Sequence, residues 1–174
     1  QRASNLIKSL KIVSVDQSSD EIRKVELKKY LEEIISSLSP KIKETNHTVS
    51  IVCDEKVTIH SYPGALAQII TNFLLNSFMH AYDTEDSGNI VIEAKEDGEN
   101  IALFYRDDGM GIPLELQDRV FDPFLTTKRD SGGTGLGLHI VFNIVTNTLK
   151  GSIRLVNKPD KGTTFKVVFP KKIS

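Results

Sequence analysis

Residues 125–139 read LTTKRDSGGTGLGLH, and this stretch places four glycines within six positions. Glycine lowers the cost of positive φ, so a cluster of serine and glycine before an apolar run is often an ordinary loop. Bare backbone also lets a ligand approach N–H groups that a β-carbon would obstruct. Glycine content alone favours the ordinary loop. The hydroxyl and basic side chains just upstream, together with the rest of the chain, are needed to choose between these interpretations.

The composition of the 174-residue chain, with 39% hydrophobic residues, is that of one globular domain. The formal net charge is −1, from 22 basic and 23 acidic side chains, so no overall field favours nucleic acid or an anionic membrane. Cys53 is the only cysteine, which excludes an internal disulfide, and the four histidines lack the spacing of a zinc site. We therefore expect a cytoplasmic domain without a nucleic-acid partner.

The first residues contain a short apolar pattern. Ala3, Leu6, Leu10 and Val13 follow a heptad seam, which indicates either a helix with a dimerisation partner or a lone helix that docks on its own domain. The chain begins at Gln1 rather than methionine, which suggests a piece of a longer polypeptide. Its longest strictly apolar run is about five residues, so any membrane anchor is expected outside it.

Helical and strand patterns are interleaved along the rest of the chain. Apolar residues at helical spacing predict helices from Leu27 and from Pro63, and the first should end or kink at Pro40. Alternating apolar residues around an Asp97–Gly98 turn predict a hairpin. Hairpins imply a largely antiparallel sheet, so we predict a two-layer α/β sandwich with helices on one face. The other expected elements are strands at 47–53 and 56–60 joined by a turn, a helix at 135–149 and a hairpin at 151–170.

The helix predicted from 63 to 82 carries a polar line on an otherwise apolar segment. Asn72, Asn76 and His80 are four residues apart, so they follow one side of the helix over roughly 12 Å. Asparagine is a poor helix former, and its amide oxygen suits magnesium that completes its shell with substrate phosphates. A plain solvent-facing side of the helix is the alternative interpretation.

Acidic residues end the second strand of the first predicted hairpin. In YRDDGMGIP, Asp107 and Asp108 precede Gly109 and Gly111, and a carboxylate beside bare backbone can accept a hydrogen bond from an amine while a flat ring approaches. The exocyclic amine of adenine is such a donor. An ordinary Asp-Gly turn is the alternative, whereas an EF-hand calcium loop would need spaced acids and a terminal glutamate that are missing here.

Five motifs follow one another in a specific order: NFLLNSFMH, DDGMG, FDPF, GGTGLGL and GTTF. This succession, over about residues 22–170, resembles the ATP-binding domain of sensor histidine kinases, in the superfamily that also holds gyrase, heat-shock chaperone and mismatch-repair ATPases. The resemblance implies the Bergerat α/β sandwich, with ATP bound beside a mobile lid. It also implies that 1–19 is the end of a dimerisation helix with its linker, and that 20–174 is the catalytic domain.

The resemblance implies roles for residues in these motifs. Asn76 matches the magnesium-binding asparagine, with Asn72 one turn earlier, and both are implied to act in phosphoryl transfer. Asp107 matches the acid that reads adenine, beside the close-approach glycines Gly109 and Gly111. Further nucleotide contacts are implied for His80, Thr126, Thr127, Lys128, Gly133, Thr134, Gly135, Leu136, Gly137, Leu138 and Thr163.

The lid of this resemblance covers residues 125–131. Phe121 and Phe124 match the motif that hinges it, and the N–H groups at the start of the following helix are expected to face the triphosphate. One position departs from the family pattern, because Met79 stands where a lysine is common. We therefore expect His80 next to it, or Lys128 in the lid, to supply that phosphate contact.

The resemblance also bears on the reaction. Hydrolysing relatives carry glutamate where this chain has Asn72, which cannot take a proton at neutral pH, so attack by water should be slow. No histidine here fits the phosphoacceptor pattern, so the acceptor is implied on an upstream helical hairpin that forms a homodimer in the intact protein, with a response regulator as the next partner. A nucleotide-binding regulatory switch is the alternative. A dinucleotide-binding protein fits less well, because the glycines follow a lid rather than a strand.

Overall fold

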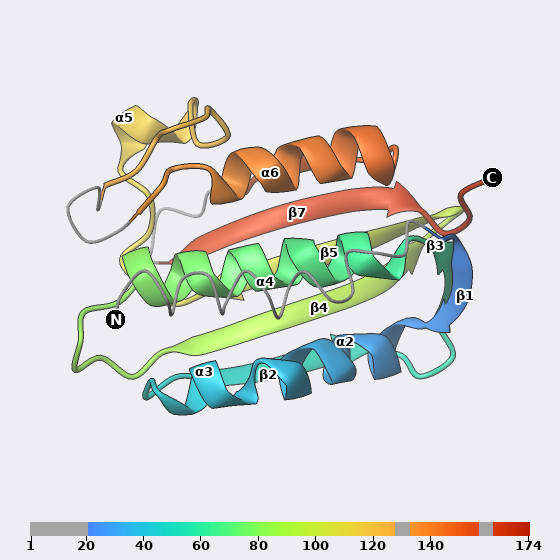
Figure 1. Ribbon diagram of the computed structural model, residues 1–174, viewed down its shortest axis with the longest axis horizontal. Helices are drawn as coiled ribbons and strands as arrows, with labels where there is room; N and C mark the ends of the chain where they lie inside the picture. The colour runs from blue at the N-terminus through green and yellow to red at the C-terminus, as the bar shows by residue number, and fades with distance from the viewer. Residues whose placement is uncertain (1–20, 128–132, 157–161) are drawn as a thin grey trace.

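The protein has two layers, a β-sheet and a set of helices that cover one of its faces (Figure 1). The computed structural model describes residues 21–127, 133–156 and 162–174. The heptad seam, the predicted domain boundary near residue 19, and Lys128 lie outside the described residues. The α/β sandwich predicted from the sequence is confirmed.

The main sheet has five strands: β2 (Thr48–Cys53), β4 (Asn89–Asp97), β5 (Asn100–Asp107), β6 (Ser152–Leu155) and β7 (Thr163–Pro170). Their order is β2-β4-β5-β7-β6, in which β2 and β4 are parallel and the other neighbours are antiparallel. Both predicted hairpins form. In the first, Asp97 faces Asn100 and Gly98 has a φ of 60°, which agrees with the predicted turn.

The helices of the second layer are α2 (Leu27–Ser37), α3 (Ser39–Lys43), α4 (Pro63–His80), α5 (Leu114–Gln117), α6 (Gly137–Asn143) and the π-helix η2 (Ile144–Thr148). Helix α4 lies across the middle of the sheet, with α2 on one side and α6 on the other (Figure 1). Phe73 of α4 stacks on Phe165 of β7 and tilts against Tyr105 of β5, each at a centroid distance of 4.9 Å. Burial of these rings between the layers contributes to the packing of α4 on the sheet.

A second, two-stranded sheet lies at the end of the molecule where the chain terminates, and it pairs β1 (Arg23–Glu26) with β3 (Thr58–Ser61) (Figure 1). The strands predicted at 47–53 and 56–60 both form, but they belong to different sheets. The C-terminal segment continues the small sheet, since His60 N–H donates to Lys171 O and Ile173 N–H donates to His60 O, both at 2.8 Å.

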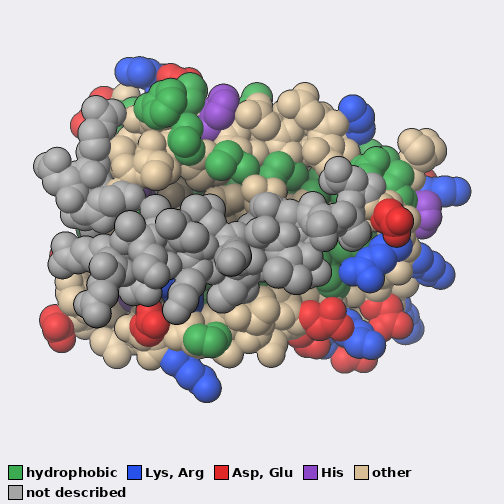
Figure 2. All heavy atoms as spheres, viewed as in Figure 1, with side chains coloured by type: hydrophobic (Ala, Val, Ile, Leu, Met, Phe, Trp, Pro, Cys, Tyr) green, Lys and Arg blue, Asp and Glu red, His purple; other side chains and the backbone are tan. Residues whose placement is uncertain are grey.

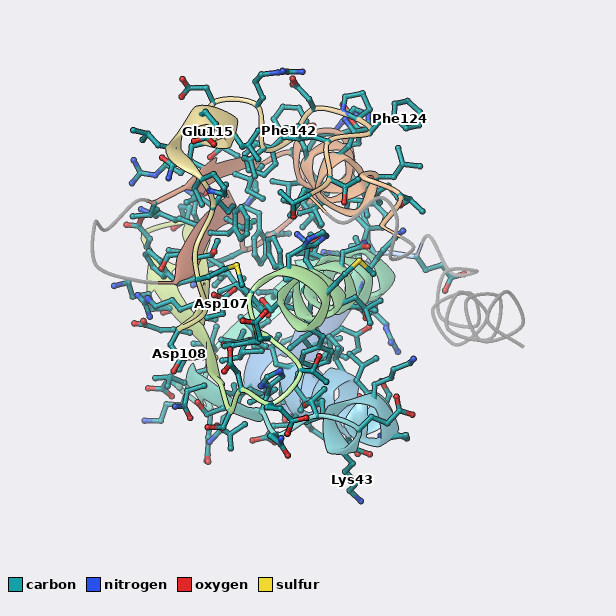
Figure 3. The ribbon with its side chains drawn as sticks, turned by 90° about the vertical axis from the view of Figure 1, so that its left-hand side faces the viewer. Lys43, Asp107, Asp108, Glu115, Phe124 and Phe142 are labelled. Atoms are coloured by element: carbon teal, nitrogen blue, oxygen red, sulfur yellow. The ribbon has the colours of Figure 1, made fainter. Side chains whose placement is uncertain are left out.

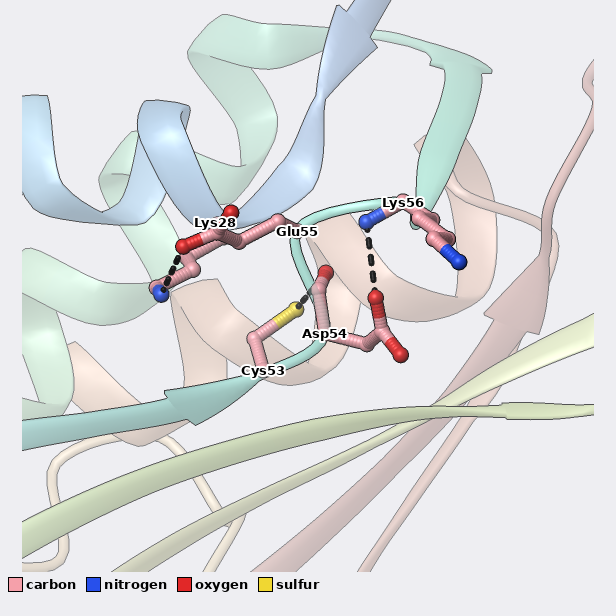
Figure 4. Close-up of polar contacts among 5 residues, drawn as sticks. All are labelled: Lys28, Cys53, Asp54, Glu55 and Lys56. Carbon is pink, nitrogen blue, oxygen red and sulfur yellow. Dashed lines mark hydrogen bonds and ion pairs between the residues drawn. The ribbon is translucent and has the colours of Figure 1, made fainter.

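The turn between β2 and β3 is held by local polar contacts (Figure 4). The backbone N–H of Lys56 donates to Asp54 Oδ1 at 2.8 Å, so the side chain of Asp54 stabilises the turn that begins at this residue. Lys28 of α2 pairs with Glu55 across 3.0 Å, and solvent screens this exposed ion pair, so it contributes little to stability. The turn therefore carries the chain from the main sheet to the small one.

The predicted end of the first helix near Pro40 is confirmed: α2 ends at Ser37, and Pro40 lies in the first turn of the separate helix α3, where its missing N–H costs no helical hydrogen bond. One helix boundary differs from the prediction. Helix α6 begins at Gly137 rather than Gly135, because Gly135 has a φ of 69° that a right-handed helix does not accommodate. The helix then continues as η2, with Leu149 N–H donating five residues back.

The surface of the helix side shows no single-sign patch at the end where β1 and β3 lie. Figure 2 shows acidic and basic side chains mixed there, which agrees with the net charge of −1. Over the described ranges, no helix combines the length and the apolar character needed to cross a membrane.

Candidate functional site

Asp107 is the last residue of the central strand β5, and its side chain is buried against the carboxyl-terminal half of α4 (Figure 3). Its Oδ2 accepts a hydrogen bond from Ser77 Oγ at 2.7 Å, and Ser77 Oγ accepts one from the Tyr105 hydroxyl at 2.8 Å. Its Oδ1 accepts the backbone N–H groups of Gly109 at 3.1 Å and Thr163 at 3.2 Å. These donors fix the carboxylate, and its oxygens retain lone pairs for a further donor.

The two adjacent carboxylates at the end of β5 differ in their electrostatic environment. Burial raises the pKa of Asp107, and the hydrogen bonds that it accepts offset only part of this effect. Burial acts in the same direction on Asp108, but hydrogen bonds from Asn89 and Tyr82 outweigh it and lower the pKa of Asp108. Asp107 is therefore a desolvated acceptor. A hydrogen bond that it accepts from the amine of a flat heterocycle is stronger than the same bond in water.

Glycines let the backbone segments around Asp107 approach one another. Gly111 and Gly162 have φ angles of 78° and 79°. A β-carbon on Gly162 would lie 1.9 Å from Asp107 O, and one on Gly111 would lie 3.1 Å from Gly162 O. A β-carbon on Gly109 would lie 2.3 Å from Ala81 O. The glycines that the sequence assigned to ligand approach are thus already required by backbone packing.

The polar line predicted on α4 faces the start of α6. A β-carbon built on Gly137 would lie 3.5 Å from Asn72 Oδ1 and 3.9 Å from Asn76 Oδ1. Asn72 Nδ2 donates to Gln68 O at 3.0 Å, so Oδ1 is the amide atom of Asn72 that points toward Gly137. Amide oxygens beside bare backbone fit a magnesium ion that is also held by phosphate oxygens. Within the described ranges, no cluster of three or more His, Cys, Asp or Glu offers another metal site.

His80 connects the end of α4 to the first residues of the predicted lid. Its Nδ1 lies 3.0 Å from Thr127 Oγ1, and Thr126 is partly buried beside it in the chain. The structure thus brings the side chains of His80 and Thr127 into contact. Lys128, the other residue predicted to replace the lysine absent at Met79, lies outside the described residues.

The two predicted hinge phenylalanines lie in different environments. Phe121 is partly buried, with its ring 5.6 Å from that of Phe142, and its carbonyl oxygen is 3.1 Å from His139 Nδ1. Phe124 is 64% exposed and has a φ of 65°. Its N–H donates to Gly135 O at 2.8 Å, and a β-carbon on Gly135 would lie 2.4 Å from Phe124 C. Gly135 is therefore needed for the close approach of this segment to the backbone of Phe124.

The remaining predicted residues form the entry to α6. Thr134 Oγ1 accepts the N–H of Leu136 at 3.3 Å, and this contact orders the turn before the helix. Gly133 is partly exposed. The side chain of Leu138 is partly buried and packs on the hydrophobic core.

Two residues of the Asp107 network were missed by sequence reasoning. Ser77 is 4% exposed on α4, and a hydroxyl among apolar residues of a helix is a usable signal, because a buried hydroxyl requires a partner. Tyr105 is fully buried in an apolar strand, where the sequence gives no sign that its hydroxyl reaches across to α4.

A desolvated acid beside a glycine-lined loop on one side of α4, and amide oxygens facing bare backbone on the other, define an ATP-binding α/β domain. The family model of histidine kinase-, DNA gyrase B-, and HSP90-like ATPases matches residues 62–173, and the chain belongs to this family.

Similar proteins carry histidine kinase names. Sporulation kinase A of Bacillus subtilis (strain 168) is 35% identical over 126 residues, which cover 68% of this chain and 18% of that protein. The solved catalytic domain of the histidine kinase ThkA superposes with a TM-score of 0.75 at 26% identity, covering 87% of this chain and 97% of that domain. The complex of ThkA with the response regulator protein TrrA has a TM-score of 0.73 at 22% identity, covers 98% of this chain and 48% of that one, and shows the fold alone. The chain spans 9–18% of the length of three curated relatives.

Proposed function

We propose that this chain is the ATP-binding catalytic domain of a sensor histidine kinase, which transfers the γ-phosphate of ATP to a histidine elsewhere in the intact protein. The observation that carries this proposal is the placement of Asp107 on one side of α4 and of the Asn72 and Asn76 amide oxygens on the other. This arrangement offers separate partners to the base and to the phosphates of one nucleotide. The names of the similar proteins point to the same activity.

Each group has a defined task in the proposed mechanism. Asp107 accepts a hydrogen bond from the amine of adenine, and the backbone of the Gly109 loop lets the ring approach. Asn76, next to Asn72, supplies an amide oxygen to magnesium, which when bound neutralises charge on the phosphates. Asn72 has no proton-accepting carboxylate, so it does not activate water, and the γ-phosphate is kept for the histidine acceptor. His80 and Lys128 are proposed to contact phosphate in place of the lysine absent at Met79.

The partners and the location of the intact protein are part of the same proposal. The phosphoacceptor is proposed on an upstream helical hairpin that forms a homodimer and includes the seam at residues 3–13. The next acceptor is proposed to be a response regulator, and the complex of ThkA with TrrA supports a partner of this class. We propose that the domain works in the cytoplasm, with any membrane anchor in segments outside this chain.

A regulatory nucleotide-binding switch without kinase activity is not favoured. The similar proteins described above are named as kinases, and no contact in the described part of the chain points to such a switch.

Phosphoryl transfer in trans tests the proposal. The chain is incubated with magnesium and γ-labelled ATP together with the separately purified helical hairpin of the intact protein. We expect an acid-labile, base-stable phosphoryl group on the hairpin. Asn76→Asp should reduce this labelling and disturb the magnesium dependence of ATP binding.

Asn147→Asp is the matched control for that variant, because the side chain of Asn147 is exposed in η2 and belongs to none of the motifs assigned to nucleotide binding. It should label the hairpin at the wild-type rate. ATP binding without any phosphohistidine on the hairpin would contradict kinase activity, and an Asn76→Asp variant with unchanged magnesium dependence would remove Asn76 from the site.

A further inference from the structure

Tyr82 lies just beyond the carboxyl end of α4, and its ring is held from two sides. The ring centroid of His47 is 4.2 Å from that of Tyr82, with an interplanar angle of 33°. On another side, a β-carbon on Gly88 would lie 2.2 Å from Tyr82 Cζ, so only glycine leaves room for the ring there. Gly88 N–H donates to His47 Nδ1 at 3.0 Å and joins these two neighbours. Tyr82 is 6% exposed, and its ring therefore has little freedom to move.

The hydroxyl of this fixed ring reaches the acidic loop. It donates to Asp108 Oδ1 at 2.8 Å. Asn89 donates to the same carboxylate twice, from its backbone N–H to Oδ1 at 2.7 Å and from Nδ2 to Oδ2 at 3.3 Å. These are hydrogen bonds to a charged acceptor, which belong to the stronger class. They hold the side chain of Asp108 in one orientation although this residue is exposed to solvent.

Asp108 directly follows Asp107 in the chain, so the hydrogen bonds that hold Asp108 in place also restrict the position of Asp107. The loop after β5 is attached to α4 and to the two residues that follow it: Ser77 Oγ donates to Asp107, Ala81 O accepts the N–H of Met110 at 2.8 Å, and the Tyr82 hydroxyl donates to Asp108. The acid that faces the base thus has its distance from α4 set by contacts on both sides of it. Figure 3 shows Asp107 and Asp108 together at this end of α4.

We propose that Tyr82 is a positioning residue for the base of the nucleotide: through Asp108, it holds the Asp107 loop in the geometry that accepts adenine. Tyr82 itself does not touch the nucleotide. Its ring packs on its neighbours, and its hydroxyl holds Asp108. A substitution that removes only the hydroxyl therefore separates the two roles. The inference rests on the proposed function, because it requires ATP to bind with its base at Asp107.

Tyr82→Phe in the 174-residue chain tests this role, because it keeps the ring and removes the hydroxyl. We expect the dissociation constant for magnesium ATP, measured by calorimetry, to rise about 3- to 10-fold, as for the loss of one hydrogen bond that acts indirectly. The affinity for magnesium tripolyphosphate, measured by competition with a fluorescent nucleotide, should change less than about twofold, because this probe has no base. The ratio of the two affinities is a readout that general destabilisation would not move.

Tyr62→Phe is the matched control, since Tyr62 precedes the opposite end of α4 and its hydroxyl makes no hydrogen bond within the described part of the chain. It should leave both affinities unchanged. A double-mutant cycle adds a second test: if Tyr82 acts through Asp108, Tyr82→Phe should have no further effect on ATP affinity in an Asp108→Ala background.

The outcomes separate this inference from the proposed function. A wild-type chain that fails to bind ATP would overturn the proposed function, and the inference with it. Wild-type ATP binding that Tyr82→Phe leaves intact, or that falls in parallel with tripolyphosphate binding, would overturn the inference alone. Fully additive effects of the Tyr82 and Asp108 changes would also overturn it.

Discussion

Replacing Asp107 with asparagine keeps the size of the side chain and removes its charge. The residue is 7% exposed, so its hydrogen bond to an adenine amine is little weakened by solvent. A hydrogen bond to a charged group contributes about 1.5–3 kcal/mol, which corresponds to a loss of about 10- to 150-fold in ATP affinity. The asparagine can still accept the N–H groups of Gly109 and Thr163, so the fold should be retained.

The same substitution should also change how stability depends on pH. Burial raises the pKa of Asp107 above its ordinary value of 3.8, so the folded state binds this proton more tightly than the unfolded state. The contribution of Asp107 to the free energy of unfolding therefore falls as pH rises from 3.8 through the raised pKa. Because an asparagine side chain does not titrate, Asp107→Asn should gain stability relative to the wild type from acid to neutral pH.

Asp108→Asn is the matched control with the opposite sign. Hydrogen bonds from Asn89 and Tyr82 overcome the effect of burial and lower the pKa of Asp108 below 3.8. Its stabilising contribution is therefore fully present above 3.8 and is lost as pH falls through the lowered pKa. Asp108→Asn should destabilise the fold at neutral pH, and this loss should shrink in acid.

Denaturant unfolding of the wild type and both variants, at neutral pH and at the acid end of the range in which the fold persists, measures the two slopes. Calorimetry with ATP measures the affinities. Equal ATP affinity of the wild type and Asp107→Asn would refute the adenine-reading role. Stability differences that have the same sign and slope for both variants would refute the electrostatic contrast between the two carboxylates.

Two further predictions concern packing, and both are measured by denaturant unfolding. Gly162→Ala should cost about 3 kcal/mol or more, because its β-carbon would lie 1.9 Å from Asp107 O, whereas Gly98→Ala, with nothing within 4 Å, should lose only the backbone term of about 1–2 kcal/mol. Equal losses would contradict the close approach at Gly162. Phe73→Ala should cost about 3–5 kcal/mol, and Phe104→Ala, at a partly exposed position, clearly less. A smaller loss at Phe73 would show that α4 does not depend on this ring.

The candidate site was predictable where one motif supplies a complete chemical group. The spacing of Asn72, Asn76 and His80 places them on one side of a helix whatever the rest of the fold does, and the structure has them there. Ser77 donates a hydrogen bond to Asp107, and Tyr105 donates one to Ser77. Each bond joins residues about thirty positions apart, and local spacing contains no information on such pairs.

Local patterns in the sequence are enough to predict the order and type of most elements, from α4 and the β4–β5 hairpin to the final β6–β7 pair. Those elements depend on side-chain period and on turn residues within a few positions. Tertiary contacts instead determine that β3 pairs with β1 and not with β2. They also determine that Gly135 cannot carry a β-carbon, because the backbone of Phe124 occupies that space. They also determine the opposite pKa shifts of Asp107 and Asp108. These features arise from burial and from hydrogen-bond partners brought in from distant parts of the chain, which become neighbours only when the two layers close on one core.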